Sequence, residues 1–219
     1  MLVANSKPKV TLSAAITLDG KIGQKNKHIV LSSKADKIRV HKLRSKSDAI
    51  LVGKNTVEQD DPLLTVRYAK GKNPIRIILD SLGTIKSNSR ILQTCKDVPT
   101  IIVVSESVSQ KNLKRLRNLP LQVLICGKRT INVSKLLNIL FKKGIKKILL
   151  EGGGTLNWSF IQKNLIDQVV IAITPYILGG KDYVNLVNGI GFKNLESAKK
   201  LKLKKVLRNN SELVLYYNL

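Results

Sequence analysis

The chain has 219 residues, of which 43% are hydrophobic, enough to bury the core of one α/β domain over residues 1–219. Lysine and arginine total 39 against 14 aspartates and glutamates, a formal net charge of +25. No stretch approaches the roughly 18–20 continuous apolar residues of a membrane span, and the first nine residues lack the apolar segment of a signal peptide. We therefore predict a cytoplasmic protein without a membrane partner.

The positive charge invites a nucleic-acid interpretation. However, the lysines are scattered along the chain, and three phenylalanines and one tryptophan offer few platforms for base stacking. We expect a solvated, lysine-rich surface, no nucleic-acid partner and a field that would equally attract a small polyanion. Cys95 and Cys126 form no C-x-x-C pair and have no neighbouring histidine cluster, so the sequence predicts no metal site and no disulfide.

In chain order, apolar runs alternate with helical patterns, which predicts a mainly parallel, twisted sheet with helices on both faces. The expected strands are residues 10–17, 49–53, 75–79, 100–104, 123–126, 148–150 and 169–174. The expected helices begin after Ser33, cover 56–61 up to Pro62, and lie within 108–119 and 133–141. Two last runs, 201–207 and 213–217, predict a C-terminal antiparallel hairpin.

The run Glu151-Gly152-Gly153-Gly154-Thr155 joins the strand at 148–150 to the start of a helix. Three glycines remove every Cβ from this turn, so backbone N–H groups at a helix N-terminus can approach a phosphate closely. The run matches neither the Rossmann nor the Walker glycine pattern, so it names no cofactor alone. It predicts a pyrophosphate cradle, and a glycine-rich turn without a ligand is the alternative.

Several further segments combine with this turn into a recognisable set. They are 17–22 (Thr-Leu-Asp-Gly-Lys-Ile), 41–44 (His-Lys-Leu-Arg), 51–57 (Leu-Val-Gly-Lys-Asn-Thr-Val), 60–67 (Asp-Asp-Pro-Leu-Leu-Thr-Val-Arg) and the Gly179-Gly180 pair after Thr174-Pro175. Together they closely resemble the riboflavin-biosynthesis reductase family, which is related to dihydrofolate reductase, over nearly the whole chain. The zinc deaminase module fused to bacterial members is absent, since no H-x-E with P-C-x-x-C occurs.

The resemblance implies a dihydrofolate-reductase-like α/β fold of the stand-alone archaeal or fungal type and a homodimer. It implies NADPH-dependent reduction of the ribosylamino side chain of 2,5-diamino-6-ribosylamino-4(3H)-pyrimidinone 5′-phosphate to ribitylamino, in riboflavin biosynthesis. NADPH is the expected cofactor with NADH as an alternative, since Lys86 and Arg90 are available for a 2′-phosphate but unassigned. Hydride stereochemistry, the proton donor and the dimer surface are left open.

The resemblance also assigns residues to the cofactor. These are Thr56, Asp60, Leu79, Asp80, Ser81, Leu82, Gly152, Gly153, Gly154 and Thr155. The alternative for Thr56 and Asp60 is a capped short helix that ends at proline, and for Asp80 and Ser81 it is ordinary turn chemistry.

The substrate assignment covers Ser32, Ser33, Arg44, Leu64, Arg67 and Glu151. Serines at a helix start and two arginines suit a phosphate, with helix capping and solvated charge as the alternatives. Glu151 and Asp60 are assigned as catalytic. The resemblance places Glu151 against the ribose, where a carboxylate beside the glycine turn could accept sugar hydroxyls and stabilise an iminium. His41 is expected to be a polar residue on a helix face, and Trp158 a packing anchor.

Two alternatives within the class are reduction of the deaminated pyrimidine, 5-amino-6-ribosylaminouracil 5′-phosphate, and reduction of a pterin. A third, from another class, is a basic nucleic-acid-binding protein that keeps a reductase scaffold. Salt-sensitive binding to nucleic acid without reductase activity would favour this last alternative.

Overall fold

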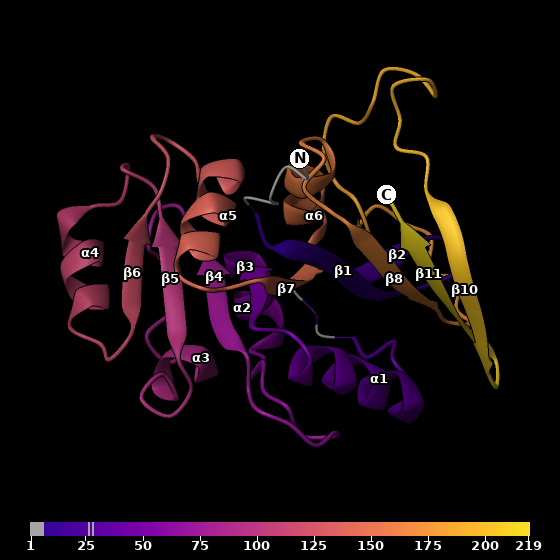
Figure 1. Ribbon diagram of the computed structural model, residues 1–219, viewed down its shortest axis with the longest axis horizontal. Helices are drawn as coiled ribbons and strands as arrows, with labels where there is room; N and C mark the ends of the chain where they lie inside the picture. The colour runs from indigo at the N-terminus through magenta and orange to yellow at the C-terminus, as the bar shows by residue number, and fades with distance from the viewer. Residues whose placement is uncertain (1–6, 26, 28) are drawn as a thin grey trace, which may run out of the picture.

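The computed structural model describes residues 7–25, 27 and 29–219 of the chain. The six N-terminal residues, on which most of the signal-peptide interpretation depends, lie outside the described residues. A nine-stranded sheet runs in the order β10-β11-β8-β1-β7-β3-β4-β5-β6, and β2 and β9 form a separate two-stranded sheet (Figure 1). The strands are β1 (Lys9–Ile16), β2 (Lys21–Gln24), β3 (Ala49–Gly53), β4 (Ile75–Leu79), β5 (Thr100–Val104), β6 (Gln122–Ile125), β7 (Lys147–Gly152), β8 (Gln168–Ile173), β9 (Tyr183–Asn185), β10 (Lys202–Asn209) and β11 (Glu212–Asn218).

The middle of the large sheet is parallel, as predicted. Val10 of β1 lies opposite Ile148 of β7, and β7, β3, β4, β5 and β6 continue in the same direction. β11 pairs antiparallel with both β8 and β10, which confirms the C-terminal hairpin. The α/β fold class is therefore confirmed.

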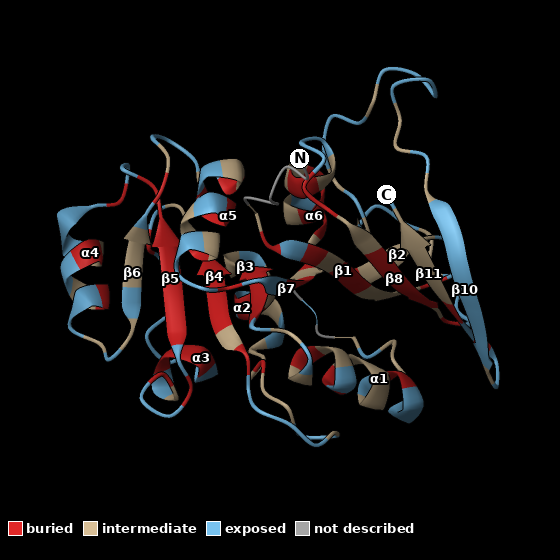
Figure 2. Ribbon diagram, viewed as in Figure 1, coloured by how far each residue is buried: buried red, intermediate tan, exposed pale blue. Residues whose placement is uncertain are grey.

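Helices cover both faces of this sheet because the strands are apolar on both sides. They are α1 (Lys34–Ser45), α2 (Lys54–Asp60), α3 (Arg90–Gln93), α4 (Gln110–Arg117), α5 (Val133–Lys142) and α6 (Gly154–Ile161). Leu51 of β3 packs on the side of α5 and α6, whereas its neighbours Ile50 and Val52 pack with α2, α3 and α4. Burial follows this layering: β4 and β5 are enclosed, while β10 at the sheet edge is exposed (Figure 2).

Local signals explain where two helices begin and end. The Ser33 side chain accepts a hydrogen bond from the Asp36 amide and caps α1, as predicted. α2 ends at Asp60, and its C-cap Asp61, directly before Pro62, has a φ of 37° in the left-handed region. α2 begins at Lys54 rather than at residue 56, because Gly53 at the end of β3 already serves as the N-cap.

Other parts of the chain differ in how well the sequence predicted them. Trp158 is buried and makes an edge contact with Phe192, with 5.0 Å between ring centroids, so it is a packing anchor. Cys95 and Cys126 are both buried and free. The short strands β2 and β9 and the four-residue α3 were not predicted, since each is too short for a periodic pattern. No helix in the described part of the chain is long and apolar enough to cross a membrane.

Candidate active site

A cleft of about 1340 Å³ opens where parallel strands of the large sheet end. The carboxyl ends of β3, β4 and β7 contribute Gly53, Leu79 and Glu151, and β1 contributes Ser13 to Ala15. Ligands of open α/β sheets bind at this edge because loops from several strands converge there. The cleft extends from α1 past the glycine turn to the loop that follows β4.

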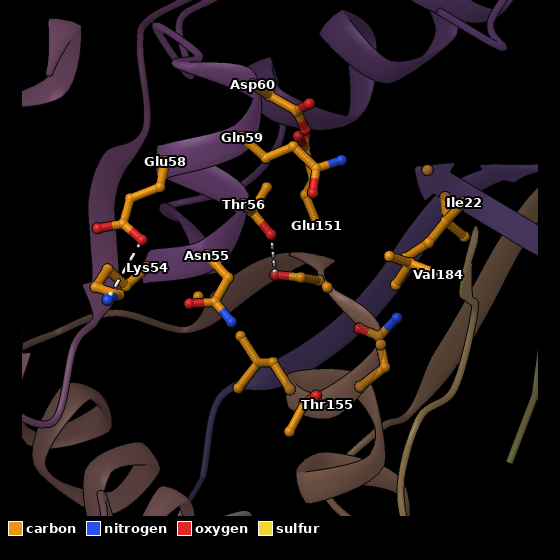
Figure 3. A pocket seen from close by; sticks show the side chains of 18 of the residues that line it. Ile22, Lys54, Asn55, Thr56, Glu58, Gln59, Asp60, Glu151, Thr155 and Val184 are labelled. Atoms are coloured by element: carbon orange, nitrogen blue, oxygen red, sulfur yellow. Dashed lines mark hydrogen bonds and ion pairs between the residues drawn. The ribbon is translucent and has the colours of Figure 1, made fainter. Parts of the chain in front are cut away.

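The glycine turn forms the middle of the cleft. Gly152 and Gly153 have φ values of 78° and 44°, which side chains with a Cβ rarely adopt. A Cβ built on Gly152 would lie 2.8 Å from Asn157 Oδ1, and one on Gly153 would lie 3.2 Å from Thr56 Oγ1. The Thr56 hydroxyl also donates to Gly152 O at 3.2 Å, which joins α2 to the turn (Figure 3).

The turn leads into α6 without a side-chain cap. The first amides of a helix have no intrahelical acceptor, so this end offers N–H groups and the positive end of the dipole to a ligand. The donor set fits a phosphate, and Gly152, Gly153 and Gly154 all line the cleft. The missing Cβ atoms let the protein's own side chains and backbone approach the turn closely. These observations support the cradle that the sequence suggested.

Beyond the turn, the loop after β4 forms one end of the cleft. Asp80 is buried, and its Oδ2 accepts a hydrogen bond of 2.7 Å from the Ile85 amide. Ser81 O accepts hydrogen bonds from both the amide and the hydroxyl of Ser105, each at 2.9 Å. Asp80 thus shapes the loop, as the turn-chemistry alternative held, while the loop itself still lines the cleft.

Basic side chains stand at this same end. Lys54 pairs with Glu58 at 3.3 Å and donates to the Thr84 hydroxyl at 3.3 Å. Lys86 also lines the cleft and is exposed. Arg90, the other candidate for a 2′-phosphate, is not among the lining residues, and its amide bonds to Asp61.

The opposite end of the cleft is built around an ion pair. Arg44 of α1 donates from Nε and Nη2 to the two oxygens of Glu151 at 2.8 and 2.7 Å. Its Nη1 donates to Thr65 O at 3.0 Å. Burial lowers the pKa of Arg44, but the charge and hydrogen bonds of Glu151 outweigh burial and raise it. Arg44 therefore stays ionised, and its guanidinium is already engaged by the protein.

Arg67 is the second arginine at this end, and it differs from Arg44 in exposure. It lines the cleft and is exposed. Within the described ranges, no acidic side chain forms an ion pair with it. Arg67 is therefore better placed than Arg44 to meet an anionic ligand.

Fourteen of the sixteen residues assigned from the sequence line the cleft. They are Ser32, Arg44, Thr56, Asp60, Arg67, Leu79, Asp80, Ser81, Leu82, Glu151, Gly152, Gly153, Gly154 and Thr155. Asp60, at the end of α2, and Glu151 are both drawn among the lining side chains in Figure 3.

Ser33 and Leu64 do not line the cleft. The amide and hydroxyl of Ser33 donate to the carboxylate of Glu212 at 3.0 and 2.6 Å, so the helix cap is tied to the C-terminal hairpin. Leu64 has a φ of 53°, and its side chain is buried in the core beside α2 and α3. Helix capping, the alternative to phosphate binding, describes Ser33 in this structure.

Other lining residues were missed by sequence reasoning. Asn157 is 1% exposed, and its Nδ2 donates to Leu186 O at 2.7 Å while its Oδ1 has no hydrogen-bond partner among the described residues. His41 is buried and also lines the cleft, rather than standing on a solvated helix face. The spacing of His41 three residues before Arg44 was the signal available, since both then share one helix face. In the described ranges, no group of three or more histidine, cysteine or acidic side chains is placed to hold a metal ion.

The fold and the cleft define the class of this protein as an α/β protein with a ligand-binding cleft at the carboxyl edge of its parallel strands. The chain belongs to the family described as the RibD C-terminal domain, whose model matches residues 8–215. This match confirms the resemblance that the motifs indicated.

The relatives include proteins of the same length and longer ones. The chain is 40% identical to the 2,5-diamino-6-ribosylamino-4(3H)-pyrimidinone 5′-phosphate reductase of Methanothermobacter thermautotrophicus, covering 96% of this chain and 98% of the relative. It is 35% identical to the protein of that name from Aquifex aeolicus, covering 95% of each. The structure of Acinetobacter baumannii RibD has a TM-score of 0.83 at 25% identity over 98% of this chain, but over only 58% of that longer protein.

Proposed function

We propose that this protein is an NADPH-dependent reductase that converts the ribosylamino side chain of 2,5-diamino-6-ribosylamino-4(3H)-pyrimidinone 5′-phosphate to ribitylamino in riboflavin biosynthesis. The observation that carries the proposal is one cleft with a phosphate-accepting glycine turn in its middle and an exposed arginine at one end. The names of relatives that this chain matches over nearly their whole length supply the substrate.

The cofactor would lie with its pyrophosphate on Gly152 to Thr155. The amides at the start of α6 would bind its oxygens, and Thr56 would keep the turn in position through Gly152 O. Leu79 to Leu82 would then border the adenosine half. When bound, the dihydronicotinamide supplies a hydride, and the protein supplies position and electrostatics.

The phosphate of the substrate would lie at the arginine end. Arg67 offers an exposed guanidinium, and Ser32 lines the same cleft. Arg44 has three of its N–H groups directed at Glu151 and Thr65, so it contributes mainly by fixing Glu151 and the loop at residue 65. This division gives the two arginines different roles.

The two carboxylates assigned to catalysis, Glu151 and Asp60, both line the cleft (Figure 3). Reduction at C1′ passes through an imine that becomes electrophilic on protonation, so positive charge develops at the C1′–N bond. A carboxylate held in a fixed place stabilises that charge without reorganisation. Arg44 holds Glu151 in such a place.

The preference for NADPH is supported by the basic end of the cleft. A 2′-phosphate on the adenosine ribose would meet Lys86, which is exposed, and Lys54, which is already paired with Glu58. We therefore assign discrimination against NADH mainly to Lys86.

The homodimer would form at the C-terminal hairpin. Leu203 and Val206 of the edge strand β10 are 50% and 48% exposed, and Leu213 of the neighbouring β11 is 42% exposed. Such a row of apolar side chains on a sheet edge is typical of an association surface. Val206→Asp should therefore halve the mass measured by light scattering, while Lys96→Ala should not.

The nine-stranded sheet joins strands from both ends of the chain, β1 and β11 among them. This continuity supports a single reductase domain over residues 1–219, for which we propose a cytoplasmic location.

The decisive experiment follows NADPH oxidation by near-UV absorbance with the diamino compound and its deaminated counterpart supplied in parallel. Rapid turnover of the diamino compound alone is the expected result. Turnover of the deaminated compound alone would instead indicate a 5-amino-6-(5-phosphoribosylamino)uracil reductase, the activity in the name of a longer, bifunctional protein from Thermotoga maritima. NADPH binding with no turnover of either would disprove the substrate.

A further inference from the structure

His41 is a buried side chain of α1, only 4% exposed, that the proposed reaction does not use. Its Nδ1 accepts a hydrogen bond of 2.7 Å from the Arg67 amide and a longer one of 3.3 Å from the Tyr68 amide. An imidazole nitrogen accepts only when it carries no proton. His41 therefore binds the backbone of the loop that carries Arg67.

The remainder of that loop is held in the same way, by side chains that reach its backbone. Arg44 donates to Thr65 O at 3.0 Å, and Asn73 Oδ1 accepts from the Val66 amide at 2.8 Å. In each of residues 65–68, a backbone group is therefore hydrogen-bonded by a side chain from another part of the chain. The Arg67 guanidinium is exposed at the cleft, while the backbone that carries it is held in place. Fewer conformations must therefore be lost when Arg67 binds an anion.

The charges around His41 favour its neutral form. Two positive groups, Arg44 on the same helix and Arg67 on the loop, act on His41 against one negative group, Glu151 on β7. The Tyr68 ring also makes an edge contact with the imidazole, with 4.8 Å between the ring centroids. Burial first, and then the two arginines, lower the pKa of His41 from 6.5 to about 4, although Glu151 opposes this. The acceptor on Nδ1 is therefore retained throughout the neutral pH range.

We propose that His41 is a positioning residue for the substrate phosphate, which acts by holding the backbone of Arg67 and Tyr68 so that Arg67 faces the cleft. This inference rests on the proposed function. It assigns His41 no proton transfer to substrate, so the loss of His41 should weaken substrate binding and leave the chemical step nearly intact.

Two substitutions at His41 separate the contribution of the Nδ1 hydrogen-bond acceptor from that of the aromatic ring. His41→Phe keeps an aromatic ring against Tyr68 but removes the acceptor, whereas His41→Asn places an oxygen near the position of Nδ1. We expect His41→Phe to raise KM for the phosphorylated substrate about 10-fold, with kcat and KM for NADPH changed less than about 3-fold. His41→Asn should restore KM to within about 3-fold of the wild type.

A double-mutant cycle with Arg67→Ala tests whether the effect of His41→Phe on KM depends on Arg67. If His41 acts through Arg67, adding His41→Phe to Arg67→Ala should raise KM no further. The same compound without its 5′-phosphate should show the same KM with wild type and His41→Phe. An additive double variant, or a His41→Asn enzyme as impaired as His41→Phe, would overturn the inference.

The outcome also separates this inference from the proposed function. If the wild type turns over neither pyrimidine, the proposed function fails and the inference fails with it. If the wild type is active and His41→Phe leaves KM unchanged, the inference alone fails. Should His41→Phe not fold, His41→Gln serves in its place, because its amide is one methylene too far out to keep the Nδ1 acceptor.

Discussion

The middle of the cleft and its arginine end are built by different means. The glycine turn in the middle is made of backbone, within five consecutive residues from Glu151 to Thr155. The arginine end is made of side chains, and its central ion pair joins Arg44 to Glu151 across 107 residues of sequence. A phosphate cradle of backbone amides needs only local conformation, whereas a fixed carboxylate needs a partner brought by the fold.

This difference predicts which measured property changes when each part of the cleft is altered by mutation. Changing a side chain at the arginine end should alter turnover or substrate binding and leave the cofactor bound. Adding a side chain to the turn should weaken the cofactor first. The four predictions below test this division, from the largest expected effect to the smallest.

The largest effect is expected for Glu151→Gln. The substitution removes the charge that Arg44 pairs with and leaves a buried guanidinium without its carboxylate. We expect kcat to fall on the order of 100- to 1000-fold, while the Kd for NADPH stays within about 2-fold. Stopped-flow turnover and fluorescence titration measure the two quantities, with the exposed Glu196→Gln as the control. Equal losses in both would rule out a role specific to turnover.

Gly153→Ala should have the next largest effect. A Cβ there needs the left-handed φ of 44° and lies 3.2 Å from Thr56 Oγ1, the hydroxyl that holds the turn through Gly152 O. We expect the Kd for NADPH to rise about 30-fold, since one lost charge-assisted contact and local strain each contribute about 1 kcal/mol. Gly144→Ala is the matched control, because its φ is 87° and no atom lies within 4 Å of its Cβ. An equal loss of affinity in both variants would mean that strain alone is responsible.

The same contrast explains what the sequence could and could not predict. The strands of the large sheet, most helices and the glycine turn follow from local periodicity and composition, and the structure confirms them. Ser33 was assigned to phosphate, but Glu212 binds it from 179 residues away. Leu64 looked like part of a binding loop, yet the fold turns its side chain into the core. The role of His41 depends on a loop amide that no pattern of helix spacing could reveal.

Lys86→Ala should produce a smaller effect, confined to one cofactor. Removing a single exposed cation that meets the 2′-phosphate should raise KM for NADPH about 10-fold, equivalent to about 1.4 kcal/mol, and leave KM for NADH unchanged. Initial rates with both cofactors measure the ratio, and the exposed Lys96→Ala is the control. A parallel change in both values would assign Lys86 to the adenosine or the loop rather than to the 2′-phosphate.

The smallest effect concerns stability against pH at His41. The unfolded chain binds a proton on this histidine below about 6.5, whereas the folded protein does so only near its lowered pKa of about 4. The free energy of unfolding should therefore fall as the pH decreases from 6.5 to 4. The full difference corresponds to about 3 kcal/mol, and screening at the cleft edge reduces the expected loss to about 1 kcal/mol. Urea unfolding of wild type and His41→Asn across this range isolates the contribution, because the remaining titrating groups are common to both proteins. If the free energies of unfolding of the two proteins ran parallel against pH, His41 would not be held neutral by the fold. The acceptor that holds the Arg67 loop would then be lost in mildly acidic solution.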